Sequence, residues 1–188
     1  SGVKTAVKTV VLSCEMLAYS HESQVRRIHD ELSKLFDEVT VIVYLRRQME
    51  SLISWYSELH KMGVPFPTFE TLLATQPAVA ENYLFNYEMV LGIWSRYFGE
   101  EHVKPRIFHR KEMVNNDLLD DFAETAGFDN SPLTRFDSVN HALSSEVIEF
   151  CRLLNKSYSL FTPDGKVNPD RLTMVRVLVD KFARSGNR

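Results

Sequence analysis

The sequence has 188 residues, of which 44% are hydrophobic and 25% are charged, a composition typical of one globular domain spanning residues 1–188. Its net charge of −3 argues against a general nucleic-acid-binding protein, which would usually be basic. No apolar run approaches the about 18 residues that a membrane span needs. No secretory leader is recognisable, so we expect a cytoplasmic protein. The two cysteines, Cys14 and Cys151, lie in apolar stretches and are expected to be reduced core residues.

The hydrophobic pattern predicts strands alternating with helices. Continuous, valine-rich runs predict strands at 7–12 and 39–45, and a weaker strand, interrupted by Pro105, is predicted at 103–109. Helical spacing of apolar residues predicts helices at 20–36, 48–62, 68–75, 83–98, 112–126, 143–155 and 169–183, with a turn at 162–165 before the last. This order indicates an α/β fold with a mostly parallel sheet. So few strands suggest that the chain is part of a larger sheet domain.

Charged residues within the predicted helices are expected to face solvent. In the acidic run 117–121 we expect the aspartates to be exposed and Leu118, Leu119 and Phe122 to point inward. The basic residues of the last helix are expected to form a solvated face: Arg171, Arg176, Lys181 and Arg184. The six histidines and two cysteines show no metal-ligand spacing, so no metal is expected. All six histidines are expected to be structural or exposed, and His109, at a strand end, is the one that could lie at the same sheet edge as the site described next.

Polar residues follow the first two predicted strands. Ser13 and Glu15 follow the first, and Arg46 and Arg47 follow the second. Ligands of open α/β sheets bind beyond the carboxyl ends of the strands, so we expect these side chains to share one crevice. Arginine offers a planar fork of donors that suits phosphate oxygens. Ser54 lies outside the apolar stripe of the following helix, so an arginine at the strand end and this serine can hold one phosphate between them.

Arg46 followed by Ser54-Trp55-Tyr56 resembles the segment that binds the 3′-phosphate in sulfotransferases, which use 3′-phosphoadenosine-5′-phosphosulfate (PAPS) as donor. The closer resemblance is to bacterial sulfotransferase-like proteins associated with surface-polysaccharide genes. Their pattern is a strand ending in Ser-Ser-Glu, a strand reading Tyr-Leu-Arg-Arg-Gln, and a helix with Ser-x-Tyr. The matching stretches here are Leu12-Ser13-Cys14-Glu15, Tyr44-Leu45-Arg46-Arg47-Gln48 and Ser54-Trp55-Tyr56, with further likeness as far as residue 156.

This resemblance implies a three-layer sandwich with the topology of P-loop-containing nucleotide hydrolases. It also implies binding of the 3′-phosphate by Arg46 and Ser54, a general base at Glu15, and Ser13 and Arg47 near the donor. The reaction would transfer a sulfuryl group from PAPS to a hydroxyl of a carbohydrate acceptor, without a metal.

The sequence departs from the family at the loop Gly-x-x-Lys-Thr-Gly-Thr, which cradles the 5′-phosphosulfate and is not found here. Either a preceding part of the protein carries that loop, or this family member has lost it. Two main hypotheses therefore stand: a sulfotransferase domain that transfers sulfate from PAPS, and a non-catalytic module of the same fold that serves protein interaction. A third, weaker alternative is a nucleotide kinase or other phosphoryl transferase, which would need a P-loop and magnesium-binding carboxylates that are not evident in the sequence. Each predicted site residue also has a structural interpretation, with Glu15 as a helix start, Arg46 as a strand-end arginine and Ser54 as a solvated helix position.

Overall fold

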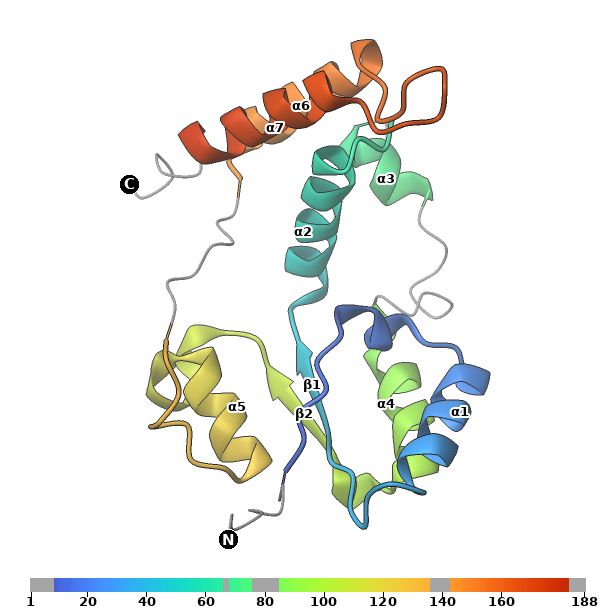
Figure 1. Ribbon diagram of the computed structural model, residues 1–188, viewed down its shortest axis with the longest axis vertical. Helices are drawn as coiled ribbons and strands as arrows, with labels where there is room; N and C mark the ends of the chain where they lie inside the picture. The colour runs from blue at the N-terminus through green and yellow to red at the C-terminus, as the bar shows by residue number, and fades with distance from the viewer. Residues whose placement is uncertain (1–8, 66–67, 76–84, 136–142, 183–188) are drawn as a thin grey trace, which may run out of the picture.

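The computed structural model describes residues 9–65, 68–75, 85–135 and 143–182 of the chain (Figure 1). Its helices are α1 (Glu22–Leu32), α2 (Gln48–Lys61), α3 (Phe69–Thr75), α4 (Tyr87–Phe98), α5 (Leu118–Ala126), α6 (Ser145–Ser157) and α7 (Pro169–Phe182). Short 3-10 helices are η1 (Glu15–Tyr19), η3 (Glu100–His102), η4 (Arg110–Glu112) and η5 (Val114–Asn116). The strands are β1 (Val41–Leu45) and β2 (Val103–Ile107). The predicted mixed α/β class is confirmed, with a parallel sheet of two strands in the described part of the chain.

The two strands pair in register from Val41 opposite Val103 to Leu45 opposite Ile107. Phe108 N–H extends the ladder by donating to the Leu45 carbonyl at 2.7 Å. Since alternate residues of a strand point their N–H groups to opposite sides, Pro105 turns its nitrogen away from β1. A proline is tolerated there because no ladder hydrogen bond is lost.

The strand predicted at 7–12 is wrong for its described part. Residues 9–12 form no strand, and the Leu12 side chain is 65% exposed. Residues 7 and 8 lie outside the described residues. A valine-rich run becomes a strand only where a neighbouring edge pairs with it and buries its side chains. Cys14, expected in the core, is exposed for the same reason, whereas Cys151 is buried and both thiols are free, as expected.

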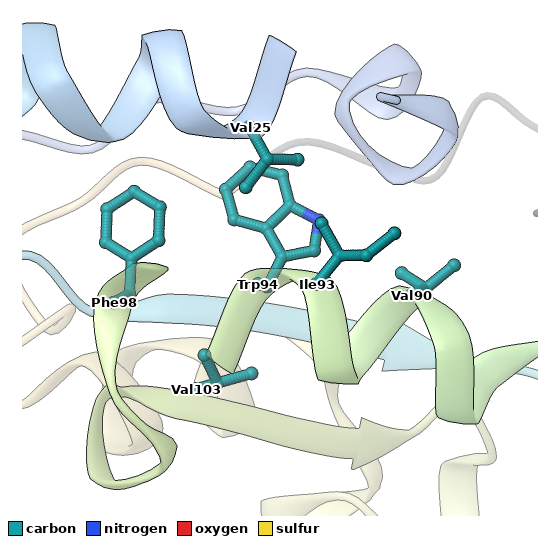
Figure 2. Packing of buried hydrophobic residues seen from close by; sticks show 6 residues of the cluster. All are labelled: Val25, Val90, Ile93, Trp94, Phe98 and Val103. Carbon is teal, nitrogen blue, oxygen red and sulfur yellow. The ribbon is translucent and has the colours of Figure 1, made fainter. Parts of the chain in front are cut away.

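Helices flank both sides of the sheet: α5 lies on one side, and α1 and α4 lie on the other (Figure 1). Figure 2 shows the core between α1, α4 and β2, made by Val25, Val90, Ile93, Trp94, Phe98 and Val103. The expected core position of Trp94 and Phe98 is thus confirmed, and their rings stack with centroids 5.5 Å apart. Burial of these side chains is the main favourable term that holds α1 and α4 on the sheet.

A buried carboxylate joins the sheet to α5. Asp121 is fully buried, and its Oδ2 accepts hydrogen bonds from Tyr44 Oη at 2.7 Å and Arg106 Nε at 3.0 Å. Its Oδ1 accepts from the Val114 N–H at 3.1 Å and from Arg106 Nη2. The bonds from Arg106 lower the pKa of Asp121 to about 2, against the opposing effect of burial, and Tyr44 and Val114 add to the lowering. Burial and the bond to Asp121 raise the pKa of Tyr44.

The expected orientation of the acidic run 117–121 is therefore wrong. Asp121 points inward, whereas the Leu119 side chain is 52% exposed. The helix predicted from residue 112 also begins later, because Asp117 caps α5 by accepting from the N–H groups of Leu119 at 2.9 Å and Asp120 at 3.1 Å. The partners of Asp121 come from β1, β2 and the segment before α5, which a helical periodicity cannot foresee.

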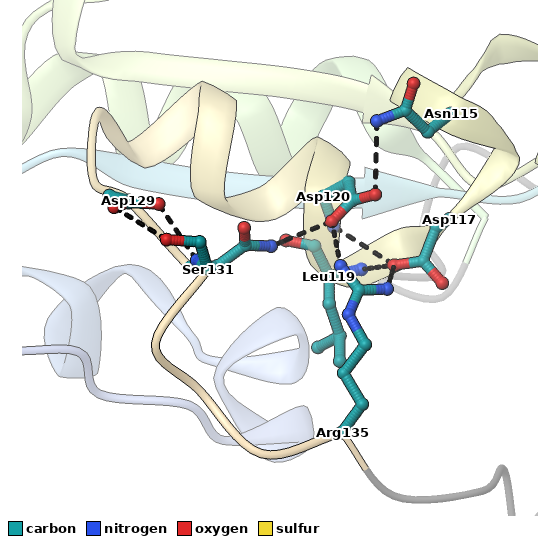
Figure 3. A network of polar contacts seen from close by, with 8 residues as sticks. Asn115, Asp117, Leu119, Asp120, Asp129, Ser131 and Arg135 are labelled. Carbon is teal, nitrogen blue, oxygen red and sulfur yellow. Dashed lines mark hydrogen bonds and ion pairs between the residues drawn. The ribbon is translucent and has the colours of Figure 1, made fainter.

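A second polar network holds the segment after α5 against the start of that helix (Figure 3). Arg135 forms ion pairs with Asp117 at 3.1 Å and with Asp120. Asn130 Nδ2 donates to Asp120 Oδ1 at 2.9 Å, and Asn115 Nδ2 donates to Asp120 Oδ2 at 3.2 Å. The bonds from Asn130 and Asn115 lower the pKa of Asp120. These carboxylates lie at the N-terminus of α5, where the helix dipole favours negative charge.

Helix α2 leads from the sheet to a second core (Figure 1). Leu52, Tyr56, Leu72 and Phe85 form its buried cluster, with Trp55, Phe69 and Ile148 packed against them. The expected packing role of Trp55 and Tyr56 is thus confirmed. Helices α6 and α7 lie at the C-terminal end of α2 (Figure 1). Arg171, expected on a solvated face, is instead fully buried there. None of the helices in the described ranges is both long enough and apolar enough to cross a membrane.

Replacing Asp121 with asparagine should lower the free energy of unfolding at pH 7 by about 3 kcal/mol, because the Arg106 guanidinium loses its buried partner. The folded-state pKa of Asp121 lies below its ordinary 3.8, so the carboxylate stabilises the fold above about pH 4 and loses that effect toward pH 2. The stability difference between wild type and Asp121→Asn should therefore shrink over this window in urea denaturation. Asp37→Asn, at an exposed aspartate, is the control and should change stability by at most about 0.5 kcal/mol. An equal effect of both substitutions would contradict the assignment.

Replacing Gly63 with alanine should destabilise the protein more than replacing Gly127 does. Both glycines follow a helix with positive φ, +85° and +74°, so each alanine carries a backbone cost of about 1–2 kcal/mol. A Cβ at Gly63 would in addition lie 2.6 Å from Arg171 Cζ, whereas one at Gly127 meets no described atom within 4 Å. Overpacking should add at least about 1 kcal/mol at Gly63, because Arg171 is held by hydrogen bonds. Thermal unfolding of both variants measures the difference, and equal melting temperatures would count against the contact.

Candidate functional site

The carboxyl ends of β1 and β2 place an arginine against an aromatic ring. Leu45 pairs with Ile107, so the residues that follow, Arg46 and Phe108, are also neighbours. Arg46 Cζ lies over the Phe108 ring, 4.5 Å from its centroid. This cation–π contact orients the guanidinium at the strand end without using its hydrogen-bond donors. No residue in the described part of the chain accepts a hydrogen bond from these donors, so they can serve a ligand.

A pocket of about 340 Å³ opens at this edge of the sheet. Its walls come from the end of β1 and the first turn of α2 on one side, and from the end of β2 and η4 on the other. The residues that line it are Leu45, Arg46, Arg47, Glu50, Ile107, Phe108, His109 and Glu112. The expected position of Arg46 and Arg47 in a crevice beyond the strand ends is thus observed.

The two walls of the pocket differ in charge. Arg46 and Arg47 lie on the α2 side, where the first N–H groups of the helix also carry positive partial charge. Arg47 is exposed, and its Nη1 lies 3.9 Å from Glu50 Oε1. An exposed ion pair of this length contributes little to stability. His109 and Glu112 lie on the opposite wall. An anionic group is therefore best accommodated at the α2 wall.

Hydrogen bonds from the start of α4 fix the start of α2. Tyr87 Oη donates to the Arg46 carbonyl and lies 3.2 Å from Ser51 Oγ. Gln48 Nε2 donates to the Phe85 carbonyl at 2.8 Å. Gln48, which belongs to the predicted edge motif, thus holds the backbone near α4. These contacts fix the backbone of Arg46 from the side of α4.

Ser54 lies in the second turn of α2 and is half-buried. It is not among the residues that line the pocket. Its spacing from Arg47 and Glu50 places all three on one face of the helix, the face that begins at the pocket wall. Arg46 precedes this helix and is not on that face, so the joint binding of one phosphate by Arg46 and Ser54 stays a prediction.

Ser13 and Glu15 do not line the pocket. Both are exposed, and Glu15 is the first residue of η1. Figure 1 shows η1 toward the end of the sheet at which β1 stops. The structure thus brings Arg46 and Arg47 together with β2 residues, but leaves Glu15 outside the wall that they form. The role of Glu15 as a general base stays a prediction.

Five pocket residues were not among the sequence candidates: Leu45, Glu50, Ile107, Phe108 and Glu112. Phe108 follows a strand whose end pairs with the end of β1, so the register of a parallel pair is the signal that would have found it. His109 was expected to be structural or exposed and was noted only for its place at a strand end; the structure shows that it lines the pocket. Among the residues that the structure describes, no group of three or more histidine, cysteine or acidic side chains is arranged to hold a metal ion.

We compared the chain with protein-family models, with curated proteins and with solved structures, and none of the three comparisons gave a match.

Proposed function

We propose that this chain is the 3′-phosphate-binding part of a sulfotransferase domain that uses PAPS as donor. The observation that carries the proposal is the pocket at the carboxyl ends of β1 and β2, with Arg46 and Arg47 beside the N-terminus of α2. Two guanidinium groups and a helix N-terminus suit a phosphate. The Phe108 ring contacts the face of the Arg46 guanidinium, a contact that does not use its hydrogen-bond donors.

The proposed fold is a three-layer sandwich with P-loop-like topology, of which the parallel pair and its flanking helices would be a part. Parallel strands, helices on both sides and a pocket at the carboxyl edge agree with that topology. The loop that would grip the 5′-phosphosulfate is not in this sequence. The proposal therefore assigns only the 3′-phosphate end of the donor to this chain.

In the proposed reaction the hydroxyl oxygen of a carbohydrate attacks the sulfur atom of PAPS. The new oxygen–sulfur bond forms as the bond from sulfur to the 5′-phosphate oxygen breaks, and adenosine 3′,5′-bisphosphate leaves with that electron pair. Glu15 takes the proton of the hydroxyl, and Ser13 orients the reactants. Arg46, Arg47 and Ser54 hold the 3′-phosphate, so their contribution is to position the donor in line with the attack.

The alternative is a module of the same fold that binds a partner and catalyses nothing. Two observations favour it: Glu15 lies outside the pocket wall, and the phosphosulfate loop is missing from the sequence. Incubation of the protein with PAPS and neutral oligosaccharides distinguishes the two. Formation of sulfated sugar with Glu15-dependent turnover supports the transferase, whereas nucleotide binding without turnover supports the module.

Arg46→Ala should weaken binding of adenosine 3′,5′-bisphosphate by about 10- to 100-fold, because a charge-assisted hydrogen bond contributes about 1.5–3 kcal/mol. Ser54→Ala should weaken it less. Adenosine 5′-monophosphate, which lacks the 3′-phosphate, should bind weakly to wild type and be insensitive to Arg46→Ala. Isothermal titration calorimetry measures all four combinations.

Arg110→Ala is the matched control for this titration, since Arg110 is an exposed arginine close to the pocket that does not line it. It should leave both affinities within about twofold, equivalent to 0.4 kcal/mol or so. Absence of bisphosphate binding to wild type, or an equal loss with both nucleotides in Arg46→Ala, would overturn the assignment of the 3′-phosphate to this pocket.

A further inference from the structure

A buried polar core lies at the C-terminal end of α2, far along that helix from the pocket. His60 of α2 and Arg171 of α7 are both 0% exposed, and Asn155 of α6 is 7% exposed. Arg171 was expected in solvent, and neither His60 nor Asn155 was singled out as a buried residue from the sequence. A core that contains an arginine and a histidine is costly to form unless their polar atoms are satisfied.

Asn155 and Arg171 satisfy the last carbonyl groups of α2. Asn155 Nδ2 donates to the His60 carbonyl at 3.0 Å, and Arg171 Nη2 donates to the carbonyls of His60 at 3.1 Å and Lys61 at 3.0 Å. Arg171 Nη2 also donates to Asn155 Oδ1 at 2.9 Å. Helix ends leave carbonyl groups short of donors; the Gly63 N–H also reaches the His60 carbonyl at 3.1 Å, and α6 and α7 supply the side-chain part of the C-terminal cap of α2. The cap is the polar attachment of the α6–α7 pair to α2.

The imidazole of His60 takes no part in this cap. Both ring nitrogens are buried and have no hydrogen-bond partner among the described residues. The ring makes an edge contact with Tyr56, with centroids 4.4 Å apart. Burial lowers the pKa of His60, Arg152 adds to the lowering, and Glu149 opposes it. The folded protein therefore holds the imidazole neutral at pH 7.

Among the residues that the structure describes, the carboxylates near His60 are already paired or exposed. On α6, Glu149 is engaged by Arg152 through bonds of 2.7 and 2.6 Å, and Cys151 is a neutral thiol. On α7 the facing group is the Arg171 cation, and on α2 Lys61 is paired with Glu58. Glu70 of α3 is exposed and acts on Tyr56 rather than on His60. An imidazolium would thus be a second cation in the core that already holds Arg171.

We propose that His60 is a pH-sensitive switch: protonation of its imidazole releases the α6–α7 pair from the C-terminal end of α2. This inference does not depend on the proposed sulfotransferase activity. Release is selective, because the sheet, α1 and α4 are held by a separate hydrophobic cluster that contains no residue of α6 or α7. It would expose the inner side of α6, where Val147, Cys151 and Leu154 are buried.

The direction of the pH dependence follows from the sign of the shift. The pKa of His60 is lower in the folded state than in the unfolded chain. The free energy of unfolding is therefore not reduced by this histidine at pH values above the unfolded-state pKa, near 6.5. The free energy of unfolding falls as the pH drops below this value toward the folded-state pKa. One proton is taken up, so the opened fraction should rise by at most about tenfold per pH unit.

Hydrogen exchange of the whole protein between pH 7.5 and 5 tests the switch. After correction for the pH dependence of intrinsic exchange, amides of α6 and α7 should lose protection below about pH 6.5. Amides of α4 and β2 should keep theirs. His60→Leu should abolish this pH dependence, since leucine does not titrate and the cap binds the carbonyl of residue 60 rather than its ring.

His109→Leu is the matched control, because His109 is exposed and lies at the pocket. It should leave the pH dependence of α6 and α7 unchanged. The same loss of protection in wild type and His60→Leu, or none in wild type, would overturn the proposal. If His60→Leu does not fold, an NMR titration of the wild-type His60 ring decides: a pKa at or above 6.5 overturns the switch, and a lower one supports it.

Discussion

The pairing of β1 with β2 depends on the buried Asp121 carboxylate, and the pocket depends on that pairing. Asp121 accepts hydrogen bonds from Tyr44 of β1, Arg106 of β2 and the backbone before α5. A sheet of two strands buries little apolar surface, so side-chain bonds across it matter more than in a larger sheet. Because Tyr44 and Arg106 are opposite each other in the register, their shared partner fixes which residues meet at the carboxyl end. Arg46 reaches Phe108 as a consequence.

Helix α2 is the element that both halves of the molecule share. Its first turn forms one wall of the pocket, and its last carbonyls accept hydrogen bonds from α6 and α7. The two hydrophobic clusters have no residue in common, and each holds its own set of helices. Among the described residues, a change at the far end of α2 can reach the pocket through the helix itself or through the contacts of Tyr87 and Gln48 at its start.

Helices with a clear apolar stripe could be predicted from the sequence, and α2, α3 and α7 lie within a residue or two of their predicted bounds. The predictions that failed concern residues whose environment is set by distant partners. Residues 9–12 have a strand composition but form no strand in the structure. Asp121 and Arg171 were expected in solvent because charged residues usually are. Asp121 instead accepts from donors distant in sequence, such as Tyr44, and Arg171 donates to distant acceptors, such as the Lys61 carbonyl. At the site, Arg46 and Arg47 could be predicted because they come directly after a predicted strand. Phe108 could not, because its place beside Arg46 depends on the register between the two strands.

Pro105 determines on which side this sheet can grow. Its nitrogen points away from β1 and carries no hydrogen, so the middle of the outer edge of β2 lacks a donor. A chain that approached this edge would find its ladder interrupted, which is one way in which proteins prevent edge-to-edge aggregation. The outer edge of β1 carries no proline, and Val41 through Leu45 present a continuous set of backbone groups there. An additional strand would thus meet an interrupted ladder beside β2 but no proline beside β1.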